Sequence, residues 1–170
     1  MKRIVILLTA LMLFSSLYGC GQAAEPELIM PTKFYYHNNL DAKEDFDNVF
    51  VAEVHEGILY QDDTVELLNG YLSGPISENL INPFPSGLKI ISLEIIEETA
   101  YIVLSDQIAK LNGIDLTMAC SCLSLTLFDV AQCSYVQISS ENTLISDKKA
   151  IVIAKDTLLL SDDTRLITEG

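Results

Sequence analysis

An apolar run near the N-terminus, residues 4–14, limits what this chain can fold into. The run is 11 residues long, within the length of the apolar core of a secretory signal and too short to span a bilayer. Lys2 and Arg3 precede it with the positive charge that such a signal carries. We therefore expect residues 1–19 to be removed as a signal peptide. This leaves 151 of the 170 residues, a length suited to one domain with its own core.

The residues at the end of this leader, Leu17-Tyr18-Gly19-Cys20, resemble a bacterial lipobox. The resemblance to lipoprotein precursors implies that Cys20 carries a diacylglyceryl group, with fatty acids such as palmitate, and becomes the first residue of the mature protein. Two acyl chains give stable attachment, because each buried CH₂ contributes about 0.8 kcal/mol. We therefore expect Cys20 to anchor the protein in the lipid bilayer, on the extracytoplasmic face of the cell membrane. The alternative is an ordinary secretory signal with a cysteine near its cleavage site.

The chain beyond the leader is strongly acidic. It has eight basic and 24 acidic residues, a net charge of −16 with histidine neutral, because Lys2 and Arg3 leave with the leader. Phosphate backbones attract clustered Lys and Arg, so this balance argues against nucleic acid as a partner. The excess of acid keeps a domain soluble. A hydrophobic content of 49% is typical of a folded protein.

Three cysteines, Cys120, Cys122 and Cys133, remain once Cys20 is assigned to the lipid. Three thiols allow at most one intramolecular disulfide. Cys120 and Cys122 lie two residues apart on an expected helix, so their side chains point in different directions and do not converge on one ion. We therefore expect buried, apolar cysteines, no metal site and no cofactor.

Periodicity predicts strands and helices in alternation after a tether at residues 20–32. The expected strands are residues 33–36, 49–55, 89–96, 100–104, 135–139, 150–154 and 157–160. The last two are expected to pair as a terminal hairpin around Lys155-Asp156. Helices are expected at 64–72 and at 114–130, where an apolar stripe comprises Leu116, Ala119, Leu123, Leu127 and Val130. This order predicts one α+β domain at 33–165, with a single sheet of mixed strands and two helices packed on one face.

No catalytic set emerges from the residue pattern. A nucleophile needs a base, most often histidine, and His37 and His55 follow or end strands, where surface positions are commoner than catalytic ones. Ser146 and Lys149 have the Ser-x-x-Lys spacing of penicillin-interacting enzymes but lie between strands without companion motifs. The acid pairs Glu97-Glu98 and Asp162-Asp163 lie at a turn and in the tail rather than across a cleft. We therefore expect a binding or assembly protein and no enzyme.

Three segments in the middle of the chain, residues 71–75, 83–93 and 100–105, resemble the GerMN domain of sporulation and spore-germination proteins. In this resemblance Gly74-Pro75 ends a helix, and Pro85 and Gly87 lead into a hairpin. Physical chemistry agrees, since Gly74 can take the positive φ that ends a helix, Pro75 cannot continue the helix, and Gly87 allows a tight turn.

The resemblance covers about residues 33–140, and one such domain fits here where the founding members carry two. It implies a non-enzymatic extracytoplasmic domain, related in shape to ring-building domains, in which these Gly and Pro residues are structural. We thus expect a membrane-anchored assembly or interaction module of a Gram-positive bacterium, acting in sporulation or germination. Its partners would be other envelope proteins or further copies of itself.

Two other functions stay open. The first is a small-ligand or cation-binding envelope lipoprotein, whose site would be the acids Asp41, Glu44, Asp45 and Asp47. These acids lack the Asp-x-Asp-x-Asp-Gly frame of a calcium loop. The second is an envelope hydrolase, which would need a cleft that joins His37 or His55 to a carboxylate and a hydroxyl group.

Overall fold

The computed structural model describes residues 31–39, 49–55, 64–158 and 166–168. The strands in these ranges are β1 (Thr32–Asn38), β2 (Phe50–His55), β3 (Leu80–Ile81), β4 (Ile90–Ile96), β5 (Thr99–Leu104), β6 (Tyr135–Ser140), β7 (Ala150–Ala154) and β8 (Leu166–Thr168). The helices are α2 (Thr64–Leu72) and α3 (Gly113–Val130), with short 3₁₀ turns η2 (Asp106–Lys110) and η3 (Lys155–Thr157). The leader, the acids Asp41 to Asp47 and the pair Asp162-Asp163 lie outside the described residues.

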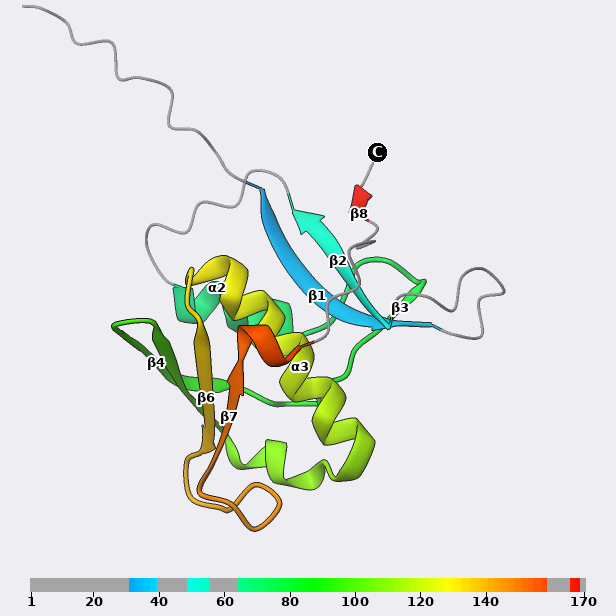
Figure 1. Cartoon of the computed structure of the whole chain (residues 1–170). Coiled ribbons are helices and arrows are strands. Elements are labelled where there is room, and N and C mark those ends of the chain that lie inside the picture. Colours follow the sequence, from blue (N-terminus) through cyan, green and yellow to red (C-terminus); the bar gives the residue numbers. More distant parts are fainter. Residues whose placement is uncertain (1–30, 40–48, 56–63, 159–165, 169–170) are drawn as a thin grey trace, which may run out of the picture.

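The strands form two mixed sheets (Figure 1). The first sheet has the order β3-β1-β2-β8, and the second has the order β4-β5-β6-β7. β1 is antiparallel to β2 and β3, whereas β8 joins β2 in parallel. In the second sheet, β5 and β6 are parallel and the two outer pairs are antiparallel. The α+β class is confirmed, but the expectation of a single sheet with both helices on one face is corrected.

The long helix α3 explains why there are two sheets. It packs against β1 of the first sheet and β6 of the second, and it lies between them in Figure 1. Every residue from Ala119 to Phe128 is buried, so α3 is apolar around its whole circumference, as expected for a helix inside a core. Among the described residues α3 is long and apolar enough to cross a membrane. Its burial between two sheets identifies it as a core helix instead.

Most of the predicted elements are confirmed. α2 occupies residues 64–72, as its Leu68 and Leu72 spacing indicated, and both leucines are buried. The hairpin of β4 and β5 has the expected antiparallel register, with Ile96 opposite Thr99. Buried hydrophobic residues of both sheets and both helices form one core cluster, which is consistent with one domain.

The terminal hairpin is corrected at its connection, whereas residues 159 and 160 of its predicted second strand lie outside the described residues. Residues 155–157 form the turn η3, in which the Thr157 hydroxyl donates to the Ala154 carbonyl oxygen at 2.7 Å. Short polar side chains of this kind compete with strand pairing by bonding the nearby backbone. The next described strand, β8, pairs with β2 of the first sheet rather than with β7. The chain therefore crosses from one sheet to the other after η3.

Substitutions at two neighbouring residues of α3 should change the free energy of unfolding in opposite directions. Leu123 is 1% exposed, so Leu123→Ala should lower the free energy of unfolding by about 2–5 kcal/mol through the cavity that it leaves. Within the described residues the buried Ser124 hydroxyl has no hydrogen-bond partner, so Ser124→Ala should raise that free energy by about 1 kcal/mol. Urea denaturation of both variants measures the two changes, and a loss of stability in Ser124→Ala would contradict the packing.

Candidate functional site

The Gly74-Pro75 turn ends α2 and begins the candidate site. The Gly74 N–H group donates to the Tyr71 carbonyl oxygen at 3.1 Å. Gly74 has φ of +119°, and a Cβ atom there would lie 2.9 Å from Asn82 Nδ2. Glycine is required both by the backbone conformation and by the space available. Its predicted role in ending the helix therefore agrees with the geometry.

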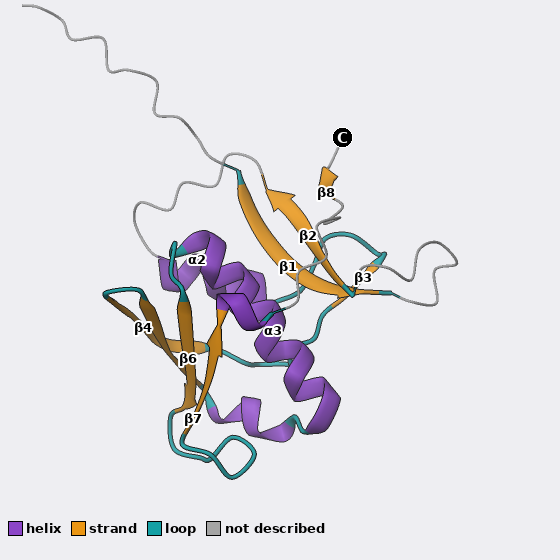
Figure 2. Ribbon diagram, in the orientation of Figure 1, coloured by secondary structure: helices purple, strands orange, loops and turns teal. Residues whose placement is uncertain are grey.

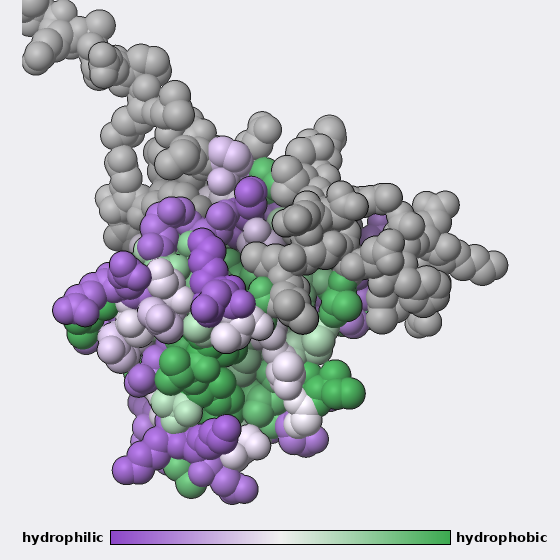
Figure 3. Space-filling model, viewed as in Figure 1, coloured by the Kyte–Doolittle hydropathy of each residue, from purple (hydrophilic) through white to green (hydrophobic). Residues whose placement is uncertain are grey.

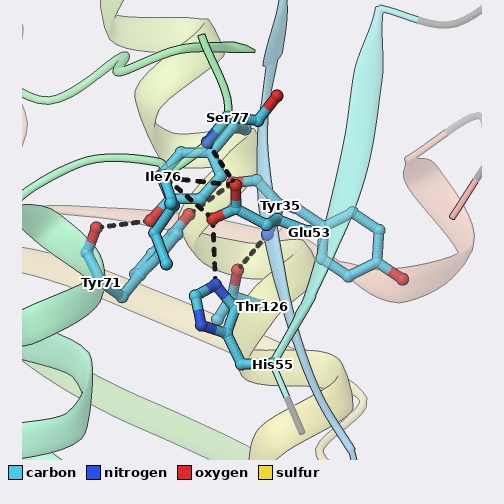
Figure 4. A network of polar contacts seen from close by, with 8 residues as sticks. Tyr35, Glu53, His55, Tyr71, Ile76, Ser77 and Thr126 are labelled. Atoms are coloured by element: carbon cyan, nitrogen blue, oxygen red, sulfur yellow. Dashed lines mark hydrogen bonds and ion pairs between the residues drawn. The ribbon is translucent and has the colours of Figure 1, made fainter. Parts of the chain in front are cut away.

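A buried carboxylate from β2 holds the segment that follows this turn (Figure 4). Glu53 is only 1% exposed. The Ser77 N–H group donates to Glu53 Oε1 at 2.8 Å, and the Ile76 N–H group lies 3.1 and 3.2 Å from the two carboxylate oxygens. Hydrogen bonds to a charged acceptor are the strong ones, and they offset the cost of burying the carboxylate. Glu53 therefore fastens β2 to the chain beyond α2.

His55 is the partly exposed member of this cluster. Its Nε2 atom lies 2.9 Å from Glu53 Oε2, and its side chain is 17% exposed. The imidazole ring also packs against Phe34, with ring centroids 5.0 Å apart. With Nε2 protonated, His55 is the third donor to the carboxylate. Both oxygens of Glu53 therefore accept hydrogen bonds, from the backbone of residues 76 and 77 and from His55.

Side chains from both helices satisfy the backbone of Tyr35 on β1. Its N–H group donates to Thr126 Oγ1 of α3 at 3.0 Å, and its carbonyl oxygen accepts from the Tyr71 hydroxyl of α2 at 2.7 Å. Open strand edges otherwise recruit foreign strands. The edge of β1 is thus closed at this residue by Thr126 and Tyr71.

The two buried tyrosines act as fixed donors. The Tyr36 hydroxyl donates to the Tyr71 carbonyl oxygen at 2.9 Å, and the two rings lie 5.0 Å apart. Burial raises the pKa of both phenols well above the usual value, and the charge of Glu53 raises the pKa of Tyr36 further. Both phenols therefore stay protonated and keep donating at any physiological pH.

The second motif, Pro85 to Gly87, forms the turn into β4. The Leu88 N–H group donates to the Pro85 carbonyl oxygen at 3.1 Å, and Gly87 has φ of +78°. A positive φ at the third residue of a turn favours glycine. Asn82 connects this region to the first motif, because its Nδ2 atom donates to the Leu72 carbonyl oxygen at 3.2 Å. The four motif residues therefore shape the connection between α2 and β4.

The other candidate groups are placed apart from one another. In the pairing of β1 with β2, His55 lies opposite Thr32 and His37 lies opposite Phe50, which separates the two histidines by most of the strand length. Burial lowers the pKa of His37. Ser146 occupies a tight turn in which Ile145 and Lys148 exchange backbone hydrogen bonds of 2.9 and 3.0 Å. This turn is not the helix start that a Ser-x-x-Lys nucleophile requires.

The described cysteines are free and buried. Burial raises the pKa of Cys120 to about 12 and also raises the pKa values of Cys122 and Cys133. A thiol of this kind is a poor nucleophile and a poor metal ligand, because both roles need the thiolate. In the described ranges no group of three or more His, Cys, Asp or Glu residues could hold a metal ion. Cys20 lies outside those ranges.

Sequence reasoning missed the central role of Glu53. The signal was present, because Glu53 stands in the otherwise apolar stretch Phe50-Val51-Ala52-Glu53-Val54. An acid inside a strand that is buried on both faces must find donors. Its donors, the Ile76 and Ser77 backbone groups, are more than twenty residues away, so the pattern of residues alone did not identify them.

Comparison with solved structures concerns the fold. The chain is similar to the tandem GerMN domains of the sporulation protein GerM from Bacillus subtilis, with a TM-score of 0.51 and 19% identity over 76% of this chain and 47% of that one. This chain therefore spans about half the length of the GerM structure. A protein from Clostridium perfringens, provisionally assigned as a lipoprotein, has a TM-score of 0.39 and 18% identity over 75% of this chain and 89% of its own. No protein-family model matches the sequence, and no curated protein matches it at a significant level.

The chain thus has a GerMN-like fold, as the Gly74-Pro75 and Pro85-Gly87 motifs predicted. In this fold the two motifs lie at the two ends of the connection from α2 to β4. The Glu53 carboxylate holds the start of that connection by accepting from the Ser77 N–H group.

Loss of the Glu53 carboxylate should destabilise the whole domain. Glu53→Ala removes the acceptor of the Ile76 and Ser77 N–H groups and the partner of His55, so the free energy of unfolding should fall by about 2–4 kcal/mol. Glu53→Gln keeps one acceptor oxygen and should lose less. Glu94→Ala, an exposed acid of β4, is the control and should change stability by less than about 0.5 kcal/mol. Equal effects of Glu53→Ala and Glu94→Ala in urea denaturation would refute the role of Glu53.

The cysteines offer a test of burial. In a Cys20→Ser variant at about pH 8, Cys120, Cys122 and Cys133 should resist a thiol reagent while the protein is folded, because burial keeps them protonated and inaccessible. All of them should react in concentrated guanidinium chloride. Rapid labelling of Cys120 in the folded protein, read by mass spectrometry, would show that α3 is not packed as described.

Proposed function

We propose that this protein is a membrane-anchored lipoprotein of the extracytoplasmic face that acts as a non-catalytic assembly or interaction module in sporulation or spore germination. The observation that carries the proposal is a GerMN-like fold placed behind the lipobox-like residues 17–20. GerM, which has this fold twice, is described as a sporulation protein. The proposal extends that description to a chain with one such domain.

The chemistry of the described groups supports a module without catalysis. Glu53 is fully engaged by donors, the buried thiols have raised pKa values, and Ser146 lies in a hairpin turn. Catalysis of acyl or glycosyl transfer needs a free nucleophile or carboxylate beside a base. His55 does contact a carboxylate, that of Glu53, but both oxygens of Glu53 already accept backbone hydrogen bonds, and His37 lies at the other end of the strand pair.

The anchor limits where such a module can work. β1 begins at Thr32, so 11 residues connect Cys20 to the fold, and an extended chain of that length spans at most about 40 Å. The domain therefore operates within several tens of ångströms of the bilayer. Partners must be membrane proteins or proteins held at the same surface.

The anchor itself is tested by Cys20→Ala in the native host. The variant should lose labelling by a fatty acid analogue and should stay unprocessed or be shed into the medium, because the acylated thioether is missing. Fractionation and mass spectrometry of the mature N-terminus provide the readout. A processed Cys20→Ala protein that stays in the membrane fraction would contradict lipid anchoring.

The assembly role is tested separately in sporulating cells. Deletion of the chain should lower the yield of heat-resistant spores or the rate of germination, and cross-linking should join the wild-type protein to envelope proteins. The Glu53→Ala variant, if unfolded, serves as a negative control for specific cross-links. Normal sporulation and germination of the deletion strain, together with saturable calcium binding by the purified protein, would favour the cation-binding alternative.

A further inference from the structure

The second sheet is covered on one face only. Inward residues of its central strands, such as Ala100, Ile102, Val136 and Ile138, are fully buried against the core. The residues between them point the other way, and Tyr101 and Tyr135 are 36% and 47% exposed. Figure 2 shows α3 on one side of this sheet and no described helix or strand on the other. We call this open side the outer face.

Strand register places the outer face in three rows of four residues. The central row comprises Glu94, Tyr101, Gln137 and Val152. The row toward the β4-β5 turn comprises Ile96, Thr99, Tyr135 and Ala154. The row at the opposite end comprises Ser92, Val103, Ser139 and Ala150. None of these residues is buried in the monomer.

The composition of the outer face differs from that of the chain. Glu94, on the edge strand β4, is its only charged residue, although the whole chain is 20% charged with a net charge of −14. Val152 and Ile96 are 62% and 55% exposed. Where one face of a sheet packs on the core and the other faces water, the residues on the solvated face are normally polar or charged. A solvent-facing sheet surface with several exposed hydrophobic residues and one charge has the features of a contact surface.

Charge determines which partner fits. A charged partner surface would lose water without gaining an opposite charge, which is costly. The partner must therefore present an uncharged surface of its own. A second copy of this chain offers such a surface, and through this face two strongly acidic molecules can meet while each brings only one acid, Glu94, into the contact. Sheets stack in this way about 10 Å apart in β-sandwiches.

Glu94 also selects the symmetry of such a pair. Consider a two-fold axis in the plane between the two stacked sheets. If this axis is perpendicular to the strands, β4 lies on β4 of the second copy and the two Glu94 carboxylates face each other. An axis parallel to the strands places β4 on β7 of the second copy, so Glu94 meets the neutral Val152. The same axis places β5 on β6, and Tyr101 then meets Gln137. Because like charges repel, the parallel axis is favoured.

The size of the face determines how tight the contact is. Four strands spaced about 4.8 Å apart and about 17 Å long give a flat area of roughly 300–400 Å². A stable complex buries about 800 Å² per partner, so this contact is a weak one in free solution. Anchoring both copies in one membrane would raise their effective concentration and populate the pair.

We propose that the outer face of the second sheet binds the same face of a second copy, forming a two-fold symmetric dimer with stacked sheets. This inference rests on the proposed assembly role and names one partner and one surface for it. Dimerisation is measured on the protein alone, whereas the assembly role is measured in sporulating cells. Failure of one is therefore distinguishable from failure of the other.

The first test uses the mature chain, residues 20–170 with Cys20→Ser, in sedimentation equilibrium over a wide concentration range. The wild-type face should give a monomer-dimer equilibrium at high protein concentration, and Val152→Glu should weaken it by about tenfold or more, because a carboxylate would be buried opposite Glu94. Ile114→Glu is the matched control, because Ile114 is 79% exposed on α3, away from this sheet. Circular dichroism verifies that each variant is folded.

The second test determines which two-fold axis relates the two copies in the dimer. Tyr101→Cys and Gln137→Cys variants, mixed and treated with a short thiol cross-linker, should form more mixed dimers than either variant forms with itself. A monomer at the highest concentration, or equal dimerisation of wild type and folded Val152→Glu, would overturn the proposal. Preferential cross-linking of Tyr101→Cys to itself would overturn the parallel axis.

Discussion

A helix that is apolar on every side needs protein on every side, and this requirement organises the whole domain. Ten consecutive residues of α3, from Ala119 to Phe128, are buried. One sheet can cover only one side of a helix, so the first and second sheets enclose α3 from two directions. Figure 3 shows a patch of hydrophobic residues on the surface near β7. Residues of α3 and β7 line a pocket in this region. Elsewhere the helix has no water-facing side along this stretch, and the two sheets depend on it to form one core.

Several polar groups inside this core join elements that are distant in sequence. The hydroxyl of Thr126 accepts from β1, the Tyr71 hydroxyl donates to the same residue, and Glu53 accepts from the chain beyond Gly74-Pro75. Each connects two elements that are distant in sequence. Burying such groups is favourable only when all are paired, so each contact specifies one arrangement of α2, β1 and β2. The hydrogen bonds from the Ile76 and Ser77 N–H groups to Glu53 position the chain that follows Gly74-Pro75. The turn residues alone would end α2 but would not fix where the chain goes next.

The sequence predicted the local elements well, because α2, α3 and the β4-β5 hairpin follow from residue spacing and turn residues near them. It did not predict two sheets, since periodicity says which residues of a strand share a face but not which strand lies beside it. The stripe from Leu116 to Val130 suggested a helix with one apolar side. Cys120, Cys122 and Leu125 lie off that stripe and are also buried, and they were the available sign of a helix enclosed on all sides. β8 is three residues long, too short to stand out from the polar residues around it.

The two sheets solve the problem of exposed backbone and surface differently. In the first sheet, side chains from α2 and α3 close the edge of β1 at Tyr35, and β3 covers its far end. In the second sheet, the Asn69 side chain of α2 bonds the backbone of Ile90 at the edge strand β4, whereas no described helix covers the outer face, which has a single charged residue. A monomeric protein that gained nothing from this surface would be expected to place charges there, because acids are abundant elsewhere in the chain. Charged side chains are thus scarce on the face of the second sheet that no described helix covers.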